Sequence, residues 1–304
     1  MENFTAAFDE LKNVFKDRVT AFEPMSLHTS FRVGGPADIF IKPVTMDEVL
    51  ISIAVFKEFN LPYIIIGKGS NILVGDNGIR GGVVQLSALY SELKTEGSNV
   101  KAAAGASLGS VASLCLDNSL TGFEFASGIP GSVGGAVIMN AGAYGGEIKD
   151  IVSSVKVLKN GEIHTITNEE CGFRYRGSRV MDENMLVLEA EFNLQEGDYE
   201  EISAKMKELT KKRNEKQPME YPSAGSTFKR PEGYFAGKLI EDSGLKGYFV
   251  GGAQVSEKHC GFVINKGNAT AKDIADLIKH IQDTVKDKFG VDLEPEVRFV
   301  GEFV

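Results

Sequence analysis

The sequence predicts a mixed fold of α-helices and β-strands in three consecutive blocks. Residues 1–90 alternate strand-like and helix-like segments, which is typical of an α/β layer. Residues 91–200 contain mostly strand-like segments, and residues 201–304 carry two strong helical patterns. Since no internal repeat or low-complexity linker separates the blocks, we expect one compact molecule with a cleft between them.

In the first block, apolar residues at helical spacing predict helices over residues 4–15 and 46–59. Strands are expected at residues 37–42, 62–67 and 83–86. The second of these strands is short and apolar and stops at a glycine, so we expect it to be buried.

The second block begins with a predicted strand at residues 101–105 and a helix at residues 109–118. Asn160-Gly161 lies between two alternating runs in residues 152–167, which is the strongest short-range signal for a β-hairpin. One more strand is expected at residues 185–194.

The third block begins with a helix near Glu200, and its last strong helix covers residues 271–289. Thr270, with Asp273 three residues later, predicts a capping box at the start of that last helix. Gly290 is expected to end it. Its apolar stripe is formed by Ile274, Leu277, Ile278, Ile281 and Val285.

Composition narrows the class of protein. The 304 residues carry a net charge of -9, which argues against nucleic-acid binding because that needs a basic surface. No apolar run approaches the roughly 20 residues of a membrane span, and the N-terminus lacks a secretory signal. The three cysteines form no CxxC pair, so neither a metal site nor a disulfide is indicated and a cytoplasmic protein is expected.

A first glycine-rich loop directly follows the strand at residues 62–67. Exposed N–H groups in such a turn can bind phosphate oxygens, although an ordinary tight turn is an equal alternative. Ile72 stands where a dinucleotide-binding GxGxxG motif has its third glycine, so that motif is absent. The candidate cofactor-binding residues here are Gly67, Lys68, Gly69, Ser70 and Asn71.

A second stretch, residues 128–146, is a stronger cofactor signal because seven of its 19 residues are glycine. A chain that approaches a long, flat, diphosphate-bearing cofactor closely needs many such positions. From this stretch we assign to cofactor binding Gly128, Ile129, Pro130, Gly131, Ser132, Gly134, Gly135, Asn140 and Ala141.

Residues 105–109 match the GxSxG nucleophile elbow, with His164, His259 and His280 later in the chain. This pattern allows an α/β-hydrolase as a rival interpretation. No HGGG-type segment precedes it, and we favour Ser107 as the N-cap of the following helix.

Six motifs, taken in order and spacing, resemble the UDP-N-acetylenolpyruvoylglucosamine reductases from about residue 20 to the C-terminus. Each motif alone is weak, and together they are specific. They are residues 28–38 (HTSFRVGGPAD), 67–71 (GKGSN), 128–146, 173–178 (FRYRGS), 222–229 (PSAGSTFK) and 293–299 (LEPEVRF).

The resemblance implies an α+β protein that holds FAD non-covalently. Two lobes of a vanillyl-alcohol-oxidase/PCMH-like fold, residues 1–90 and 91–200, would bind the cofactor. An α+β domain of residues 201–304 would bind substrate, with its last strand returning to the active site. Only about five residues separate Leu194 from the next helix, so the chain resembles the short class that lacks a tyrosine-bearing loop.

The implied reaction consumes NADPH. It reduces UDP-N-acetyl-3-O-(1-carboxyvinyl)-glucosamine to UDP-N-acetylmuramate, a peptidoglycan precursor. By the same resemblance, NADPH and substrate use one cleft in turn, which predicts ping-pong kinetics. The alternatives are another FAD oxidoreductase of the same fold and a flavin-binding module without turnover.

The resemblance also assigns catalytic roles. Arg176 would stabilise the negative charge of the intermediate, since a guanidinium is always charged and suits a carboxylate or enolate. Glu296 would act as a neutral acid, with Glu294 as the alternative. Ser226 would donate the proton, and backbone capping is the alternative for a serine in such a turn.

The diphosphate of the substrate needs local positive charge. Where the family commonly has Lys-Asn-Pro, this chain has Lys229-Arg230-Pro231, so Arg230 could contact a phosphate or point to solvent. Lys212 is a further candidate. The residues assigned to substrate binding are Tyr175, Arg213, Gln217, Lys229 and Arg230.

Overall fold

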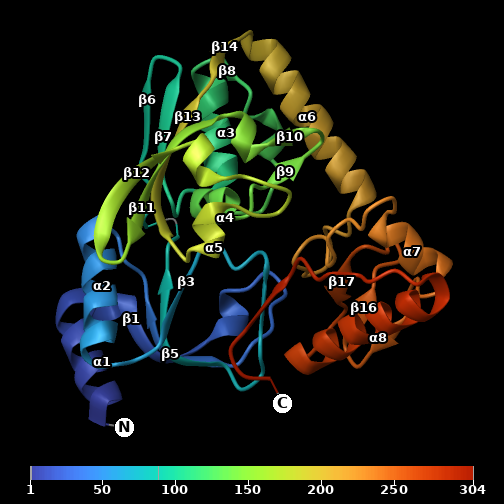
Figure 1. Cartoon of the computed structure of the whole chain (residues 1–304), viewed down its shortest axis with the longest axis horizontal. Coiled ribbons are helices and arrows are strands. Elements are labelled where there is room, and N and C mark those ends of the chain that lie inside the picture. The colour runs from blue at the N-terminus through green and yellow to red at the C-terminus, as the bar shows by residue number, and fades with distance from the viewer. Residues whose placement is uncertain (1, 88, 304) are drawn as a thin grey trace.

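The structure is a computed structural model that describes residues 2–87 and 89–303. Its first lobe is a four-stranded sheet of order β1-β2-β5-β3, in which only β1 and β2 run antiparallel (Figure 1). The strands are β1 (Val19–Pro24), β2 (Pro36–Ile41), β3 (Tyr63–Ile66) and β5 (Ile79–Gln85), and the helices are α1 (Glu2–Phe15) and α2 (Met46–Glu58).

The second lobe is an antiparallel five-stranded sheet of order β12-β11-β13-β7-β6. The predicted hairpin is confirmed: Lys159 pairs with Glu162, and Asn160 and Gly161 take φ of 53° and 90°. The elements are β6 (Leu93–Glu96), β7 (Asn99–Ala103), β11 (Val152–Lys159), β12 (Glu162–Thr167), β13 (Leu186–Asn193), α3 (Leu108–Asp117), α4 (Val133–Ile138) and α5 (Arg179–Asp182).

Helix α6 (Tyr199–Lys216) runs along the second lobe to the third (Figure 1). The third lobe holds α7 (Ala236–Asp242), α8 (Ala271–Phe289) and the antiparallel strands β15 (Phe249–Val250), β16 (Ala253–Val255) and β17 (Val263–Asn265). The capping box of Thr270 and Asp273 is confirmed, and Gly290 ends α8 with a φ of 69°. All five residues of the predicted stripe of α8 are buried.

The end of the chain fastens the third lobe to the first. Strand β18 (Arg298–Val300) pairs in parallel with β4 (Ile72–Val74), next to the first glycine loop. The Asp76 carboxylate accepts from the first two backbone N–H groups of α8, each over 2.8 Å. The remaining short elements are β8 (Leu120–Thr121), β9 (Gly142–Ala143), β10 (Gly146–Glu147), β14 (Gln195–Glu196), and 3-10 turns at 16–18, 25–27, 124–126, 148–150 and 169–171.

One expectation needs correction. Only Ile66 of β3 is buried, whereas a buried strand was expected; β3 lies at the edge of its sheet, so one side lacks a neighbouring strand. The connection before α6 is as short as expected, since β13 ends at Asn193 and α6 begins at Tyr199, and β14 pairs with β8 within it.

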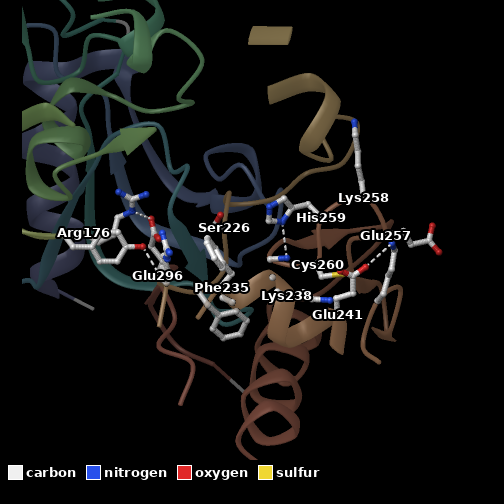
Figure 2. Close-up of a pocket in the computed structure, with 17 residues that line it drawn as sticks. Arg176, Ser226, Phe235, Lys238, Glu241, Glu257, Lys258, His259, Cys260 and Glu296 are labelled. Atoms are coloured by element: carbon white, nitrogen blue, oxygen red, sulfur yellow. Dashed lines mark hydrogen bonds and ion pairs between the residues drawn. The ribbon is translucent and has the colours of Figure 1, made fainter. Parts of the chain in front are cut away.

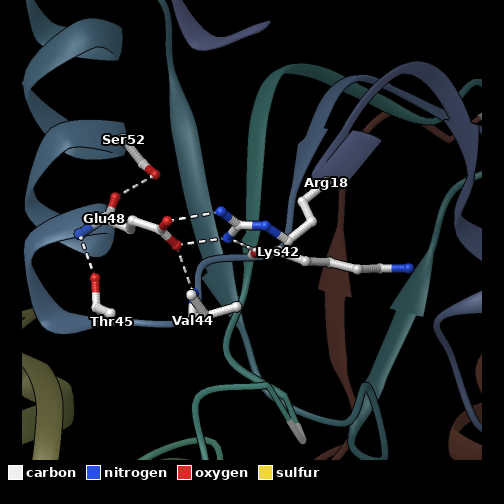
Figure 3. Close-up of polar contacts among 6 residues, drawn as sticks. All are labelled: Arg18, Lys42, Val44, Thr45, Glu48 and Ser52. Carbon is white, nitrogen blue, oxygen red and sulfur yellow. Dashed lines mark hydrogen bonds and ion pairs between the residues drawn. The ribbon is translucent and has the colours of Figure 1, made fainter. Parts of the chain in front are cut away.

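A bidentate ion pair joins the start of β1 to the start of α2 in the first lobe (Figure 3). The Arg18 guanidinium donates to both oxygens of Glu48, over 2.5 and 2.7 Å, and the Val44 backbone N–H donates to the same carboxylate over 2.7 Å. Because Arg18 holds this carboxylate in its charged form, the pKa of Glu48 lies below its ordinary value.

Candidate active site

Arg176 lies at the tip of a tight turn in the second lobe. Arg174 and Gly177 close the turn with reciprocal backbone hydrogen bonds of 3.0 and 3.2 Å. Arg176 itself takes a φ of 54°, a left-handed conformation that disfavours any residue with a Cβ. Such local strain persists only where the surroundings fix it, and it occurs frequently at functional sites.

The surroundings of Arg176 are Glu296 and the second glycine stretch. Its Nε donates to Oε1 of Glu296 over 2.8 Å, and its Nη2 lies 3.4 Å from the Gly142 carbonyl oxygen. The Arg176 and Glu296 side chains are only 21% and 16% exposed. The pair therefore sits in a largely desolvated position between the second lobe and the end of the chain.

Burial raises the pKa of Glu296 above its ordinary value, although the charge of Arg176 opposes the shift. The effect of burial on this pKa outweighs that of Arg176, because the carboxyl group is largely removed from water. Arg176 donates to Oε1, so Oε2 remains available to carry a proton. This geometry suits a carboxylic acid that donates a hydrogen bond.

Ser226 and Glu296 lie on neighbouring segments in fixed register. The Glu296 N–H donates to the Thr227 carbonyl, and the Lys229 N–H donates to the Glu294 carbonyl, both over 2.8 Å. Phe228 and Pro295 form the antiparallel bridge between these two bonds. The register places Ser226, an exposed residue, beside Glu296 at the wall of one cavity.

This cavity has a volume of about 390 Å³ and lies between the second and third lobes. In Figure 2, Ser226 stands between the Arg176–Glu296 pair and His259. Cations outnumber carboxyl groups in its lining, which holds Arg176, Arg230, Lys238, Lys246 and Lys258 against Glu241, Glu257 and Glu296. The cavity can therefore hold an extended anionic molecule with one end at Glu296.

Two of the five predicted substrate residues, Tyr175 and Arg230, line the cavity. The Arg230 backbone N–H donates to the Tyr175 hydroxyl over 3.1 Å, which joins the two walls. The Arg230 guanidinium lies 4.0 Å from the centre of the Phe235 ring, and its Nε donates to the Tyr234 carbonyl. The cation is thus fixed at the cavity wall.

The other three lie outside the lining. Lys229 donates to Glu294 over 2.5 Å, and Gln217 ends α6. Arg213 is buried against Gly128, where burial lowers its pKa. His259, Lys238, Lys246, Lys258 and Phe235 line the cavity but were missed, because they lie in loops and at helix ends without a periodic signal.

The two glycine-rich segments meet in the structure. A Cβ on Gly67 would lie 2.1 Å from the Ser132 Oγ, and one on Gly69, at a φ of 64°, would lie 2.0 Å from the His28 carbonyl oxygen. In the described part of the chain, the backbone N–H groups of Lys68, Gly69 and Ser70 donate to no protein group. Backbone N–H groups without a protein acceptor can bind the oxygens of a diphosphate.

The second stretch is partly structural. The Asn140 amide donates to Glu147 and to the Arg174 carbonyl, and its oxygen accepts from Lys149. Its side chain is thus occupied by protein, whereas Gly131 and Gly135 have only ordinary contacts at the Cβ position. Ser107 caps α3, as predicted, by accepting from the Ser110 N–H over 2.9 Å.

Comparison with known families supports a flavin site. Residues 37–167 match the family model described as an FAD binding domain. Alkyldihydroxyacetonephosphate synthase is similar in fold alone, with a TM-score of 0.50 and 15% identity over 63% of this chain and 40% of that one. The fold and the site define an FAD-dependent oxidoreductase.

The remaining comparisons specify the family. Residues 217–300 match the C-terminal domain of UDP-N-acetylenolpyruvoylglucosamine reductase. The reductase of Caldanaerobacter subterraneus is 54% identical, covering 97% of this chain and 98% of that protein, and that of Clostridium perfringens is 54% identical, covering 94% of each. The crystal structure of the Thermus caldophilus enzyme matches with a TM-score of 0.79 and 34% identity over 93% of this chain and 98% of that one. The chain belongs to the UDP-N-acetylenolpyruvoylglucosamine reductase family.

Within residues 2–87 and 89–303, no helix combines the length and apolar character needed to cross a membrane. The three cysteines are buried and free of disulfides.

Proposed function

We propose that this chain reduces the enolpyruvyl ether of UDP-N-acetylglucosamine to the lactyl ether, with Arg176, Glu296 and Ser226 as its catalytic residues. The observation that supports this most strongly is the grouping of these three side chains at one cavity. They come from three distant parts of the sequence, and Arg176 is held there in a strained conformation.

The two glycine-rich segments would hold FAD. Lys68, Gly69 and Ser70 offer free N–H groups, and the segment 128–135 lies against this loop at Ser132. When bound, FAD would accept a hydride from NADPH and supply it to the substrate. In this proposal, residues 1–90 and 91–200 form the two FAD-binding lobes, and residues 201–304 form the substrate domain.

Addition of hydride to the terminal enol carbon leaves negative charge on the adjacent carbon and its carboxylate. Arg176 would stabilise that charge with a preorganised cation. Glu296 would hold a proton on Oε2 and donate a hydrogen bond to the same group. Ser226, at the same wall, would deliver its hydroxyl proton to the carbon, which gives the saturated ether, and solvent would return a proton to the exposed serine oxygen.

The UDP part of the substrate would extend along the third-lobe wall. Tyr175 and Arg230 are the predicted residues best placed for it, together with Lys238, Lys246 and Lys258. Lys229 would bind a phosphate after its ion pair with Glu294 opens. Arg213 and Gln217 lie outside the cavity lining, so they would support the substrate site without touching the cavity.

Anaerobic flavin chemistry tests this proposal. NADPH should bleach the yellow protein, and the enolpyruvyl UDP-sugar should restore the colour without oxygen. If NADPH bleaches the flavin and the sugar does not restore it, the chain is a same-fold oxidoreductase with another substrate. If NADPH does not bleach it, the chain is a flavin-binding module.

A further inference from the structure

The side chain of Asn71 contacts the segment that carries Glu296. Its Nδ2 donates to the Glu296 carbonyl oxygen over 3.1 Å. The backbone carbonyl oxygen of Asn71 accepts from the backbone N–H of Arg298, two residues after Glu296, over 3.0 Å. Asn71 therefore binds both sides of Val297, just where the chain enters β18.

This contact is distinct from the pairing of the strands. The parallel pairing of β18 with β4 begins at Arg298 and Ile72, so Glu296 lies outside it. Residues 293–297 form no strand of their own. On the first-lobe side, the Asn71 amide group donates the hydrogen bond that fixes the Glu296 backbone, opposite the bond from Glu296 to Thr227.

The position of the Glu296 backbone decides where its carboxyl group lies. The side chain must reach Arg176 over 2.8 Å and face the cavity wall at Ser226. A residue anchored on only one side could rotate about its backbone, and a misplacement of about 1 Å can cost on the order of 100-fold in rate. Two-sided anchoring removes this freedom.

We propose that Asn71 is a positioning residue for Glu296, in addition to the place of its backbone in the cofactor loop. This rests on the proposed function, since it assumes that the Glu296 carboxyl group acts in substrate reduction. It assigns to the side chain a role in the second half of the reaction, when substrate reoxidises the flavin, rather than in flavin binding alone.

A double-mutant cycle tests this role, because a residue that acts through another has no effect once the other is neutralised. Asn71→Ala, Glu296→Gln and the double variant are loaded with FAD, and anaerobic reoxidation by the enolpyruvyl UDP-sugar is timed. Asn71→Ala should slow reoxidation by about 10-fold in the parent protein and by less than about 2-fold in the Glu296→Gln background. It should slow reduction by NADPH much less than reoxidation.

Asn77→Ala is the matched control, because Asn77 is exposed six residues further on and, within residues 2–87 and 89–303, only its backbone forms hydrogen bonds. Asn71→Asp, which has the same shape but no N–H donor, repeats the cycle. Equal losses in both backgrounds, no loss, or failure of both variants to retain FAD would each overturn the positioning role. A parent protein that is not reoxidised at all refutes the proposed function instead, so the two failures are distinguishable.

Discussion

Arg176 and Glu296 lie 120 positions apart in the sequence, and the Nε of Arg176 donates to Oε1 of Glu296 over 2.8 Å. The turn that carries Arg176 belongs to the second lobe, whereas Glu296 lies in the last segment of the chain. The proposed active site is therefore complete only when the end of the chain has returned across the first lobe.

This pairing predicts the effect of Glu296→Gln. The amide oxygen can still accept from Arg176, but the variant has no carboxyl proton. We expect anaerobic reoxidation by substrate to slow by about 100-fold or more, as for loss of a general acid. Reduction by NADPH should be largely retained.

The pH dependence gives a second readout for the same variant. Burial raises the pKa of Glu296 above 4.5, so the acid form persists to higher pH than in an ordinary glutamate. Reoxidation in the parent protein should fall as pH rises through that raised pKa, and Glu296→Gln should lack this limb. Glu294→Gln is the matched control, since Glu294 is 69% exposed and pairs with Lys229. A large loss in Glu294→Gln alone would reverse the assignment.

Ser226→Ala should separate the two halves of the reaction. The hydroxyl group lies at the cavity wall beside Glu296 and is expected to donate the final proton. We expect reduction of the flavin by NADPH to be retained and reoxidation by substrate to fall by about 100-fold or more. Ser223→Ala, three residues earlier and outside the cavity lining, is the control. Normal turnover of Ser226→Ala would rule out the proton-donor role.

Arg230→Ala tests the position at which the resemblance predicts a departure from the family pattern. Phe235 and the Tyr234 carbonyl hold the guanidinium at the cavity wall, so its remaining N–H groups can bind a phosphate. Loss of about 1.4 kcal/mol of binding would raise the KM for the UDP-sugar about 10-fold. The kcat should change little. Arg179→Ala, which removes an exposed arginine paired with Glu183, should leave both constants unchanged. An unchanged KM in Arg230→Ala would mean that Arg230 does not contact the phosphate.

Local patterns predicted most of the secondary structure, because each signal lies within a few residues. Thr270 with Asp273, and Asn160 with Gly161, specify a helix start and a hairpin by their own backbone chemistry. The motifs likewise predicted Arg176, Glu296 and Ser226 as catalytic residues by resemblance, and the structure brings all three to one cavity. The partners of these residues could not be read locally. The bond from Asn71 to Glu296 spans 225 positions and lies next to the pairing of β18 with β4, a contact that no local pattern encodes. The ion pair of Lys229 with Glu294 likewise joins distant parts of the sequence, so no local pattern showed that Lys229 is already paired.

Glu48→Gln should destabilise the first lobe, because Glu48 accepts from both Arg18 and the Val44 backbone. Hydrogen bonds to charged groups contribute about 1.5–3 kcal/mol, so the free energy of unfolding in urea should fall by about that amount.

The pH dependence of this loss follows from the Arg18 contact, which lowers the pKa of Glu48 below 4.5. The contribution of Glu48 to the free energy of unfolding is therefore fully present above the pKa of the unfolded state. It is lost as pH falls through the lower folded pKa, and the gap between parent and variant should therefore narrow in acid. Asp283→Asn, in an exposed pair with Lys279, should cost less than about 1 kcal/mol. Equal losses for the two variants would show that the Arg18–Glu48 pair is no stronger than an ordinary surface ion pair.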